Sequence, residues 1–127
     1  MERFVWICVA GALGSGTRYL VAVWAGKTLG ATFPWGTLLV NLAGCFLIAI
    51  VMYAGVEKAV LSPNLRFALA TGFLGGLTTY SSFNYETTEL VRSRALKLVA
   101  LNVGVTAIGC FIAGLLGLML ARRIFGN

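Results

Sequence analysis

Long apolar runs separated by short polar segments dominate the sequence. Four runs can be marked, and each is near the roughly 20 residues that an α-helix needs to cross a bilayer. They cover about residues 4–25, 35–56, 64–90 and 96–120. Because lipid offers no partners to backbone polar groups, the pattern predicts an all-α protein. We expect a single transmembrane domain over residues 1–127, with four helices whose short connections make successive helices antiparallel neighbours.

Composition agrees with lipid as the surrounding solvent. Hydrophobic residues make up 59% of the chain and charged residues only 11%, with a mean hydropathy of +0.90. A soluble domain carries roughly 25% charged residues, and one small core could not bury so much apolar surface. The net charge of +6 comes from basic residues that lie mainly at the ends of the apolar runs. Their position favours anchoring at the membrane interface over nucleic-acid binding.

The basic residues give almost no orientation signal. With four spans, both termini and the loop after the second run lie on one side of the membrane. That side holds Arg3, Lys58, Arg66, Arg122 and Arg123, and the other holds Lys27, Arg92, Arg94 and Lys97. Five against four is hardly the bias that the positive-inside rule requires. Two alternatives stay open: insertion both ways, which would permit an antiparallel dual-topology homodimer, or one orientation fixed by a strong local signal.

Small residues repeat every four positions in two of the runs. Gly72 and Gly76 do so in the third run, and Gly109, Ala113 and Gly117 in the fourth. This spacing is typical of close helix–helix contacts in membranes. The contacts can lie within one chain or between two copies, so the spacing alone does not predict an oligomer.

The third run contains a segment that is a poor helix. Three glycines in five residues precede two threonines, Thr78 and Thr79. We expect the helix to break near Gly75–Thr79 and to free backbone groups that must meet an ion, water or another chain. Carbonyls at the end of the first half suit a cation, and the amino end of the second half suits an anion. The alternative is an unbroken, glycine-rich packing helix.

Further polar residues lie inside the first and second runs. Arg18 must extend to the interface, face water, or pair with Glu86 or a helix end. The functional interpretation is that its positive charge attracts an anion. Asn41 shares one helix face with Thr37 and Cys45. Its amide donors suit either helix–helix hydrogen bonding or a pore lining.

Two stripes follow in the third and fourth runs. Tyr80 and Phe83 lie on one face, and their positive ring edges suit an anion, although such stripes more often serve packing. In the fourth run Asn102, Thr106 and Cys110 recur every four residues. This stripe suits either the passage of a small anion or hydrogen bonding between helices.

Three motifs together resemble those of the Fluc/CrcB fluoride channel family. They are the segment 72–83 (GFLGGLTTYSSF) followed by Glu86, the segment 36–41 (GTLLVN), and Gly14-x-x-x-Arg18. The resemblance covers essentially the whole chain. It implies passive export of fluoride through two pores in an antiparallel, dual-topology homodimer in the cell (inner) membrane. It also implies a structural sodium ion at the dimer interface, held by the main-chain carbonyls of Gly75 and Thr78.

By motif position, the resemblance also implies the fluoride pathway. Its residues would be Asn41, Tyr80, Phe83, Ser81, Ser82, Thr37, Asn102, Thr106, Cys110, Glu86 and Arg18. Two positions depart from the family pattern. Tyr80 replaces the usual phenylalanine, and Cys110 stands where a hydroxyl residue is common, so one donor is added and another weakened.

Other classes of protein fit less well. A small multidrug-resistance-type proton-coupled transporter needs an acid embedded in its first helix, and the first run has only Glu2 at its very start. A noncatalytic membrane assembly subunit stays possible if the glycines and Asn41 serve packing alone. An enzyme is disfavoured because the sequence has no histidine and no nucleophile–base pair.

Overall fold

The computed structural model describes residues 1–126, and these form helices and short connections with no strand. Three of the helices are long. They are α1 (Glu2–Thr28), α2 (Trp35–Met52), which continues into the π-helical turn η1 (Tyr53–Glu57), and α6 (Leu96–Phe125). The third apolar run is divided into α3 (Pro63–Phe67), the π-helical η2 (Ala68–Leu74), α4 (Gly75–Leu77) and α5 (Tyr80–Arg92). The all-helical class predicted from the sequence is confirmed.

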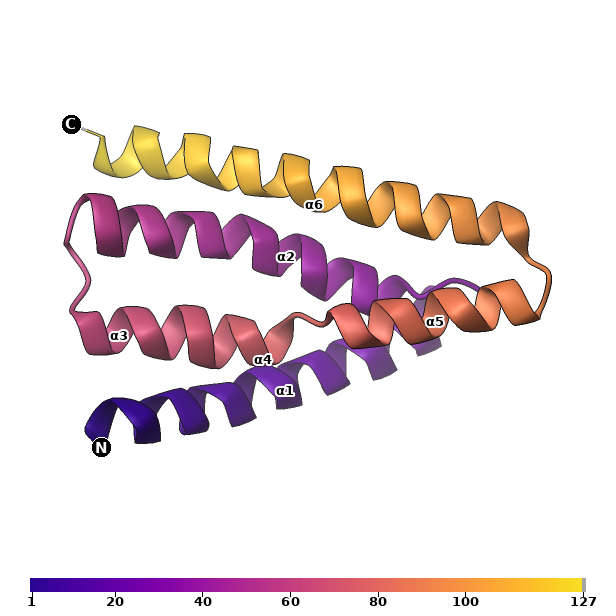
Figure 1. Ribbon diagram of the computed structural model, residues 1–127, viewed down its shortest axis with the longest axis horizontal. Helices are drawn as coiled ribbons and strands as arrows, with labels where there is room; N and C mark the ends of the chain where they lie inside the picture. The colour runs from indigo at the N-terminus through magenta and orange to yellow at the C-terminus, as the bar shows by residue number, and fades with distance from the viewer. Residues whose placement is uncertain (127) are drawn as a thin grey trace.

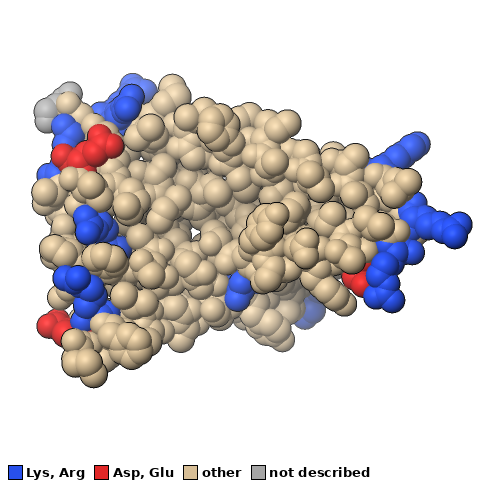
Figure 2. All heavy atoms as spheres, in the orientation of Figure 1, with Lys and Arg blue, Asp and Glu red and all other residues tan. Residues whose placement is uncertain are grey.

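The helices lie side by side along one axis, with both termini at the same end (Figure 1). α2 packs most extensively against α6, and α1 packs against η2, α4 and α2. By length and apolar character, α1, the α2–η1 helix and α6 can each cross a membrane. Lysine, arginine and acidic side chains gather mostly at the two ends of the molecule, and the middle is largely uncharged (Figure 2). This distribution is that of a membrane protein.

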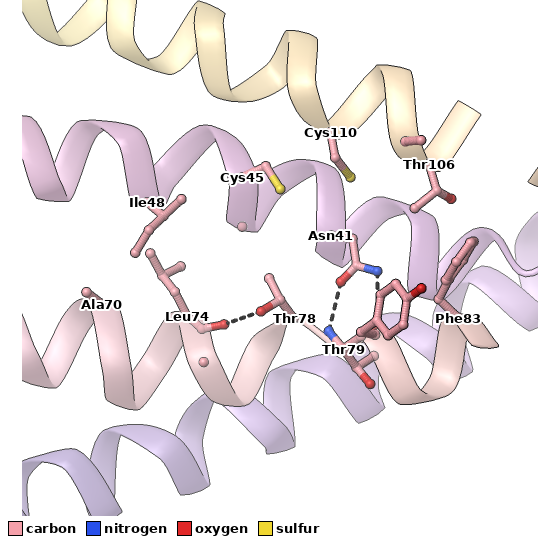
Figure 3. A pocket seen from close by; sticks show the side chains of 14 residues that line it. Asn41, Cys45, Ile48, Ala70, Leu74, Thr78, Thr79, Phe83, Thr106 and Cys110 are labelled. Carbon is pink, nitrogen blue, oxygen red and sulfur yellow. Dashed lines mark hydrogen bonds between the residues drawn. The ribbon is translucent and has the colours of Figure 1, made fainter. Parts of the chain in front are cut away.

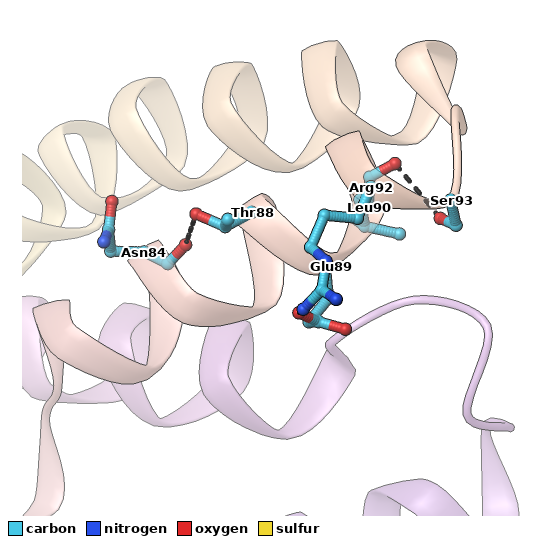
Figure 4. A network of polar contacts seen from close by, with 6 residues as sticks. All are labelled: Asn84, Thr88, Glu89, Leu90, Arg92 and Ser93. Atoms are coloured by element: carbon cyan, nitrogen blue, oxygen red, sulfur yellow. Dashed lines mark hydrogen bonds and ion pairs between the residues drawn. The ribbon is translucent and has the colours of Figure 1, made fainter.

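Polar contacts fix the ends of the third segment. At its start, the Ser62 hydroxyl accepts a hydrogen bond from the Leu65 amide at 3.3 Å, and Pro63 occupies the first helical turn, which is a favoured helix start. At its end, Arg92 pairs with Glu89 at 2.8 Å and the Ser93 hydroxyl donates to the Leu90 carbonyl (Figure 4). The Arg92–Glu89 pair is exposed, so it contributes little to stability.

The regularly spaced glycines pack helices of the same chain against one another. A side chain at Gly72 would meet the Ile7 carbonyl of α1 at 2.8 Å, and one at Gly76 would collide with the Gly11 carbonyl. In α6, Gly117 lies directly against the Phe46 carbonyl of α2. The small-residue spacing therefore predicted close contacts correctly, and the contacts are within the chain.

Candidate functional site

The interruption of the third segment lies at Thr78 and Thr79. Both residues are extended, with φ/ψ of −82°/154° and −154°/121°, and α5 restarts at Tyr80. Gly75, by contrast, has ordinary helical angles of −64° and −37°. The glycines therefore do not break the helix themselves. Gly72 and Gly76 allow α1 to approach closely, and the helix stops where threonine side chains and Asn41 replace its backbone hydrogen bonds.

Asn41 of α2 binds the interruption through both halves of its amide. Its Oδ1 accepts from the Thr79 backbone N–H at 2.8 Å, and its Nδ2 donates to the Thr79 carbonyl at 3.0 Å (Figure 3). Asn41 and Thr79 are both buried, with 8% and 7% of their surfaces exposed. A side-chain amide thus supplies a donor and an acceptor to a backbone unit that has left the helix.

The threonines complete the hydrogen bonding on either side. The Thr78 hydroxyl donates back to the Leu74 carbonyl at 2.8 Å. The Thr79 hydroxyl accepts from the Ser82 amide at 3.1 Å and caps the start of α5, which is a favoured arrangement for threonine. It also lies 3.1 Å and 3.2 Å from the hydroxyls of Ser81 and Ser82.

These contacts leave two carbonyls without their usual helical partners. In a continuous helix the Gly75 carbonyl would accept from the Thr79 amide, and the Thr78 carbonyl from the Ser82 amide. The first amide donates to Asn41 and the second to the Thr79 hydroxyl. Both carbonyl oxygens at the predicted sodium site therefore have free acceptor capacity.

Arg18 reaches the same interruption from α1. Its Nη1 lies 3.4 Å from the Thr78 carbonyl oxygen, and the Ser15 hydroxyl lies 3.5 Å from the Gly76 carbonyl oxygen. Of the alternatives for Arg18, the structure places it at a helix end and not beside Glu86. A positive charge at the carboxyl end of a helix interacts favourably with the helix dipole.

A cavity of about 470 Å³ opens beside the interruption (Figure 3). Its walls are formed by Asn41, Gly44, Cys45, Ile48, Ala70, Leu74, Gly75, Thr78, Thr79, Tyr80, Phe83, Thr106, Ala107 and Cys110. Five predicted pathway residues and both predicted sodium residues are among them. The Thr106 hydroxyl is buried and has no hydrogen-bond partner within the described residues. The cavity thus combines mostly apolar walls with a few donors, an arrangement typical of selective binding sites.

The two aromatic side chains lie next to each other at one end of this cavity. The ring centroids of Tyr80 and Phe83 are 5.6 Å apart, and the rings are inclined by 48°. Tyr80 lines the cavity but is 79% exposed, so most of its side chain lies at the protein surface. Phe83 is partly buried and is the ring better placed to present an edge to the cavity.

Other predicted pathway residues lie outside the cavity wall. Asn102 is fully buried and donates to the Thr87 hydroxyl at 2.9 Å, which in turn donates to the Phe83 carbonyl at 2.6 Å. The Thr37 hydroxyl donates to Glu86 at 2.7 Å. Glu86 and Thr37 line a separate cavity of about 510 Å³. These residues support α5 and the Phe83 backbone rather than the cavity beside the interruption.

Sequence reasoning missed two residues of the site. Thr79 was recognised only as part of the interruption, although it binds Asn41 and caps α5. Gly44 was not singled out, yet a side chain there would collide with the Thr78 methyl group. Gly44 lies one helical turn after Asn41, and that spacing was the available signal.

Comparison with known proteins identifies the family. Residues 5–118 match the family model described as "CrcB-like protein, Camphor Resistance (CrcB)". The chain is 46% identical over 126 residues to a fluoride-specific ion channel FluC of Anaeromyxobacter sp. (strain K), covering 99% of this chain and 100% of that protein. Proteins of the same name from Sorangium cellulosum (strain So ce56) and Citrifermentans bemidjiense are 43% and 44% identical, covering 100% and 98% of this chain and 100% of each relative. The chain belongs to the CrcB family.

Proposed function

We propose that this protein is a passive, fluoride-selective ion channel that spans the cell membrane with four helices and exports fluoride. Membership of the CrcB family and similarity to relatives named as fluoride-specific ion channels support this directly. The observation that carries the proposal within the structure is the buried, unpartnered Thr106 hydroxyl beside Asn41 in one cavity. A channel for a small, strongly hydrated anion must replace its water with such donors.

The cavity supplies these donors without a full positive charge in its wall. Asn41 uses one N–H for Thr79 and has a second, and Thr106 adds a hydroxyl. The ring edges of Phe83 and Tyr80 carry positive partial charge. Weak donors in a row favour passage over tight binding, because an ion must leave as readily as it enters. Asn102, Glu86 and Thr37 would act by positioning α5.

A second copy of the chain would complete the site. The nearly balanced basic residues permit insertion in both orientations, which supports an antiparallel dual-topology homodimer. Tyr80 lies beside the interruption and is largely exposed in one chain. A partner covering this surface would close the cavity, and two-fold symmetry would give two equivalent pathways.

The same dimer would hold a structural sodium ion. The carbonyls of Gly75 and Thr78 fit this role because both have lost their helical partners. The 3.4 Å contact from Arg18 leaves the Thr78 oxygen a second lone pair. Two carbonyls from each chain would form an all-oxygen site, and the ion would neutralise the negative ends of the two α4 helices.

Removal of sodium provides a test of that site. When a large organic cation replaces sodium on both sides of the membrane, we expect weaker dimer association and slower fluoride efflux, because the four carbonyls then repel one another. Potassium at the same ionic strength serves as the control for cation size. Unchanged association and efflux in the organic cation would contradict the sodium site.

The channel function itself is tested in liposomes. Purified protein should release a fluoride load, but not a chloride load, when a potassium ionophore clamps the voltage. Fluoride efflux no faster than from protein-free liposomes would exclude the channel and favour an assembly subunit. Efflux of a lipophilic cation driven by a proton gradient would instead support the multidrug-type transporter.

A further inference from the structure

Two cysteines from different helices line the cavity beside the interruption. Cys45 belongs to α2 and Cys110 to α6, and both are free thiols with partly buried side chains. Figure 3 shows the two side chains on the facing helices α2 and α6, and both also line a second cavity, of about 590 Å³, between these helices. The third cysteine, Cys8 of α1, is exposed and does not line this cavity.

The backbones of α2 and α6 are held close together around this pair. Gly114, one turn beyond Cys110, lies with its Cα near the Cys45 carbonyl, where an added side chain would be in ordinary contact at 3.7 Å. Gly117 fixes the next turn against Phe46. These contacts bring the two helices together near the pair, and the cavities that both thiols line give access to them.

We propose that Cys45 and Cys110 form a two-thiolate site for a soft, thiophilic metal ion, and that its occupation blocks the cavity. Soft thiolates select soft metals. Among residues 1–126, no three His, Cys, Asp or Glu side chains group together, so the four-ligand site that Zn²⁺ requires is missing there. The two thiols therefore suit a metal ion that prefers linear coordination by two sulfur ligands.

Charge balance selects Hg²⁺ among such ions. Each thiol loses its proton, two S–Hg bonds form, and two protons leave to water, so the product is neutral. A singly charged soft ion between two thiolates would leave one negative charge beside Ile48, Leu74 and Ala107, where an uncompensated charge is costly. The effect on transport rests on the proposed channel function, whereas binding of the metal does not.

The test uses the full chain in detergent and in liposomes, with Cys8→Ser as the background. Titration with HgCl₂ should consume both remaining thiols per ion bound, as counted with a thiol reagent after denaturation, and produce the ultraviolet absorption of a bis-thiolate. In the Cys45→Ser and Cys110→Ser variants of this background, each ion should consume one thiol. Methylmercury, which takes only one thiol, is the matched reagent and should not produce the bis-thiolate absorption.

In liposomes, HgCl₂ should reduce fluoride efflux of the Cys8→Ser protein to the protein-free rate, and a dithiol should restore it. Consumption of one thiol per Hg²⁺ in that protein, or a metal bridge between two chains detected by mass under denaturing conditions, would overturn the proposal. Absence of fluoride efflux before any metal is added would count against the channel function. The thiol titration would then still decide whether the metal site exists.

Discussion

Asn41→Ala is expected to abolish fluoride efflux and to destabilise the helical bundle. The substitution removes both hydrogen bonds to Thr79. Because the Thr79 backbone is extended, its N–H and C=O groups have no helical hydrogen-bond partners that could replace Asn41. Each buried polar group left unpaired costs about 1–3 kcal/mol, so two such groups are a large part of a typical folding free energy. The measurements are fluoride efflux from liposomes, thermal stability, and hydrogen exchange of the Thr79 amide.

Asn41→Asp separates the two roles of this side chain. An ionised aspartate still accepts from the Thr79 amide but cannot donate to its carbonyl, and it places a negative charge beside the anion route. We expect slow exchange of the Thr79 amide to persist while fluoride efflux is lost. If Asn41→Ala keeps the wild-type stability and exchange rate, then other contacts hold the interruption and Asn41 is not its main support.

The class of fold was predictable because lipid imposes it. A bilayer leaves the backbone few choices, so long apolar runs indicated helices before any contact was known. The observed limits, such as Glu2–Thr28 for α1 and Leu96–Phe125 for α6, extend beyond the apolar runs of 4–25 and 96–120. The added turns at the helix ends carry charged residues such as Arg122 and Arg123, which hydropathy alone would exclude.

The interruption was predicted, but its physical cause was not. Glycine content indicated a weak helix, whereas the structure keeps Gly75 helical and stops at Thr78. What decides the position is a pair of hydrogen bonds between residues 38 positions apart, Asn41 and Thr79. Such a contact has no local pattern in the sequence. The contact of the buried Asn102 with Thr87 was likewise not predictable from a local pattern. The polar stripe on α6 that contains Asn102 was equally compatible with a pore lining.

Gly44 and Thr78 provide the second large expected effect, because one methyl group determines how closely α2 approaches the interruption. The β-carbon of an alanine at position 44 would collide with the Thr78 Cγ2 atom. Overpacking of this kind costs about 1–3 kcal/mol. Relief of the collision requires α2 and the Thr78 side chain to move apart, which disturbs the interruption. Gly44→Ala should therefore lower thermal stability and suppress fluoride efflux.

A second substitution tests this mechanism directly. Thr78→Ser removes only the colliding methyl group and keeps the hydroxyl that donates to the Leu74 carbonyl. With that methyl absent, the nearest remaining Thr78 atom lies 3.5 Å from the new β-carbon, which is an ordinary contact. The double variant should thus recover most of the stability and efflux that Gly44→Ala loses, while Thr78→Ser alone changes both only slightly. Additive losses in the double variant would mean that the two positions are not coupled. Gly16→Ala is the matched control, because a side chain there meets open space, and its effect reports the cost of losing a transmembrane glycine that packs against nothing.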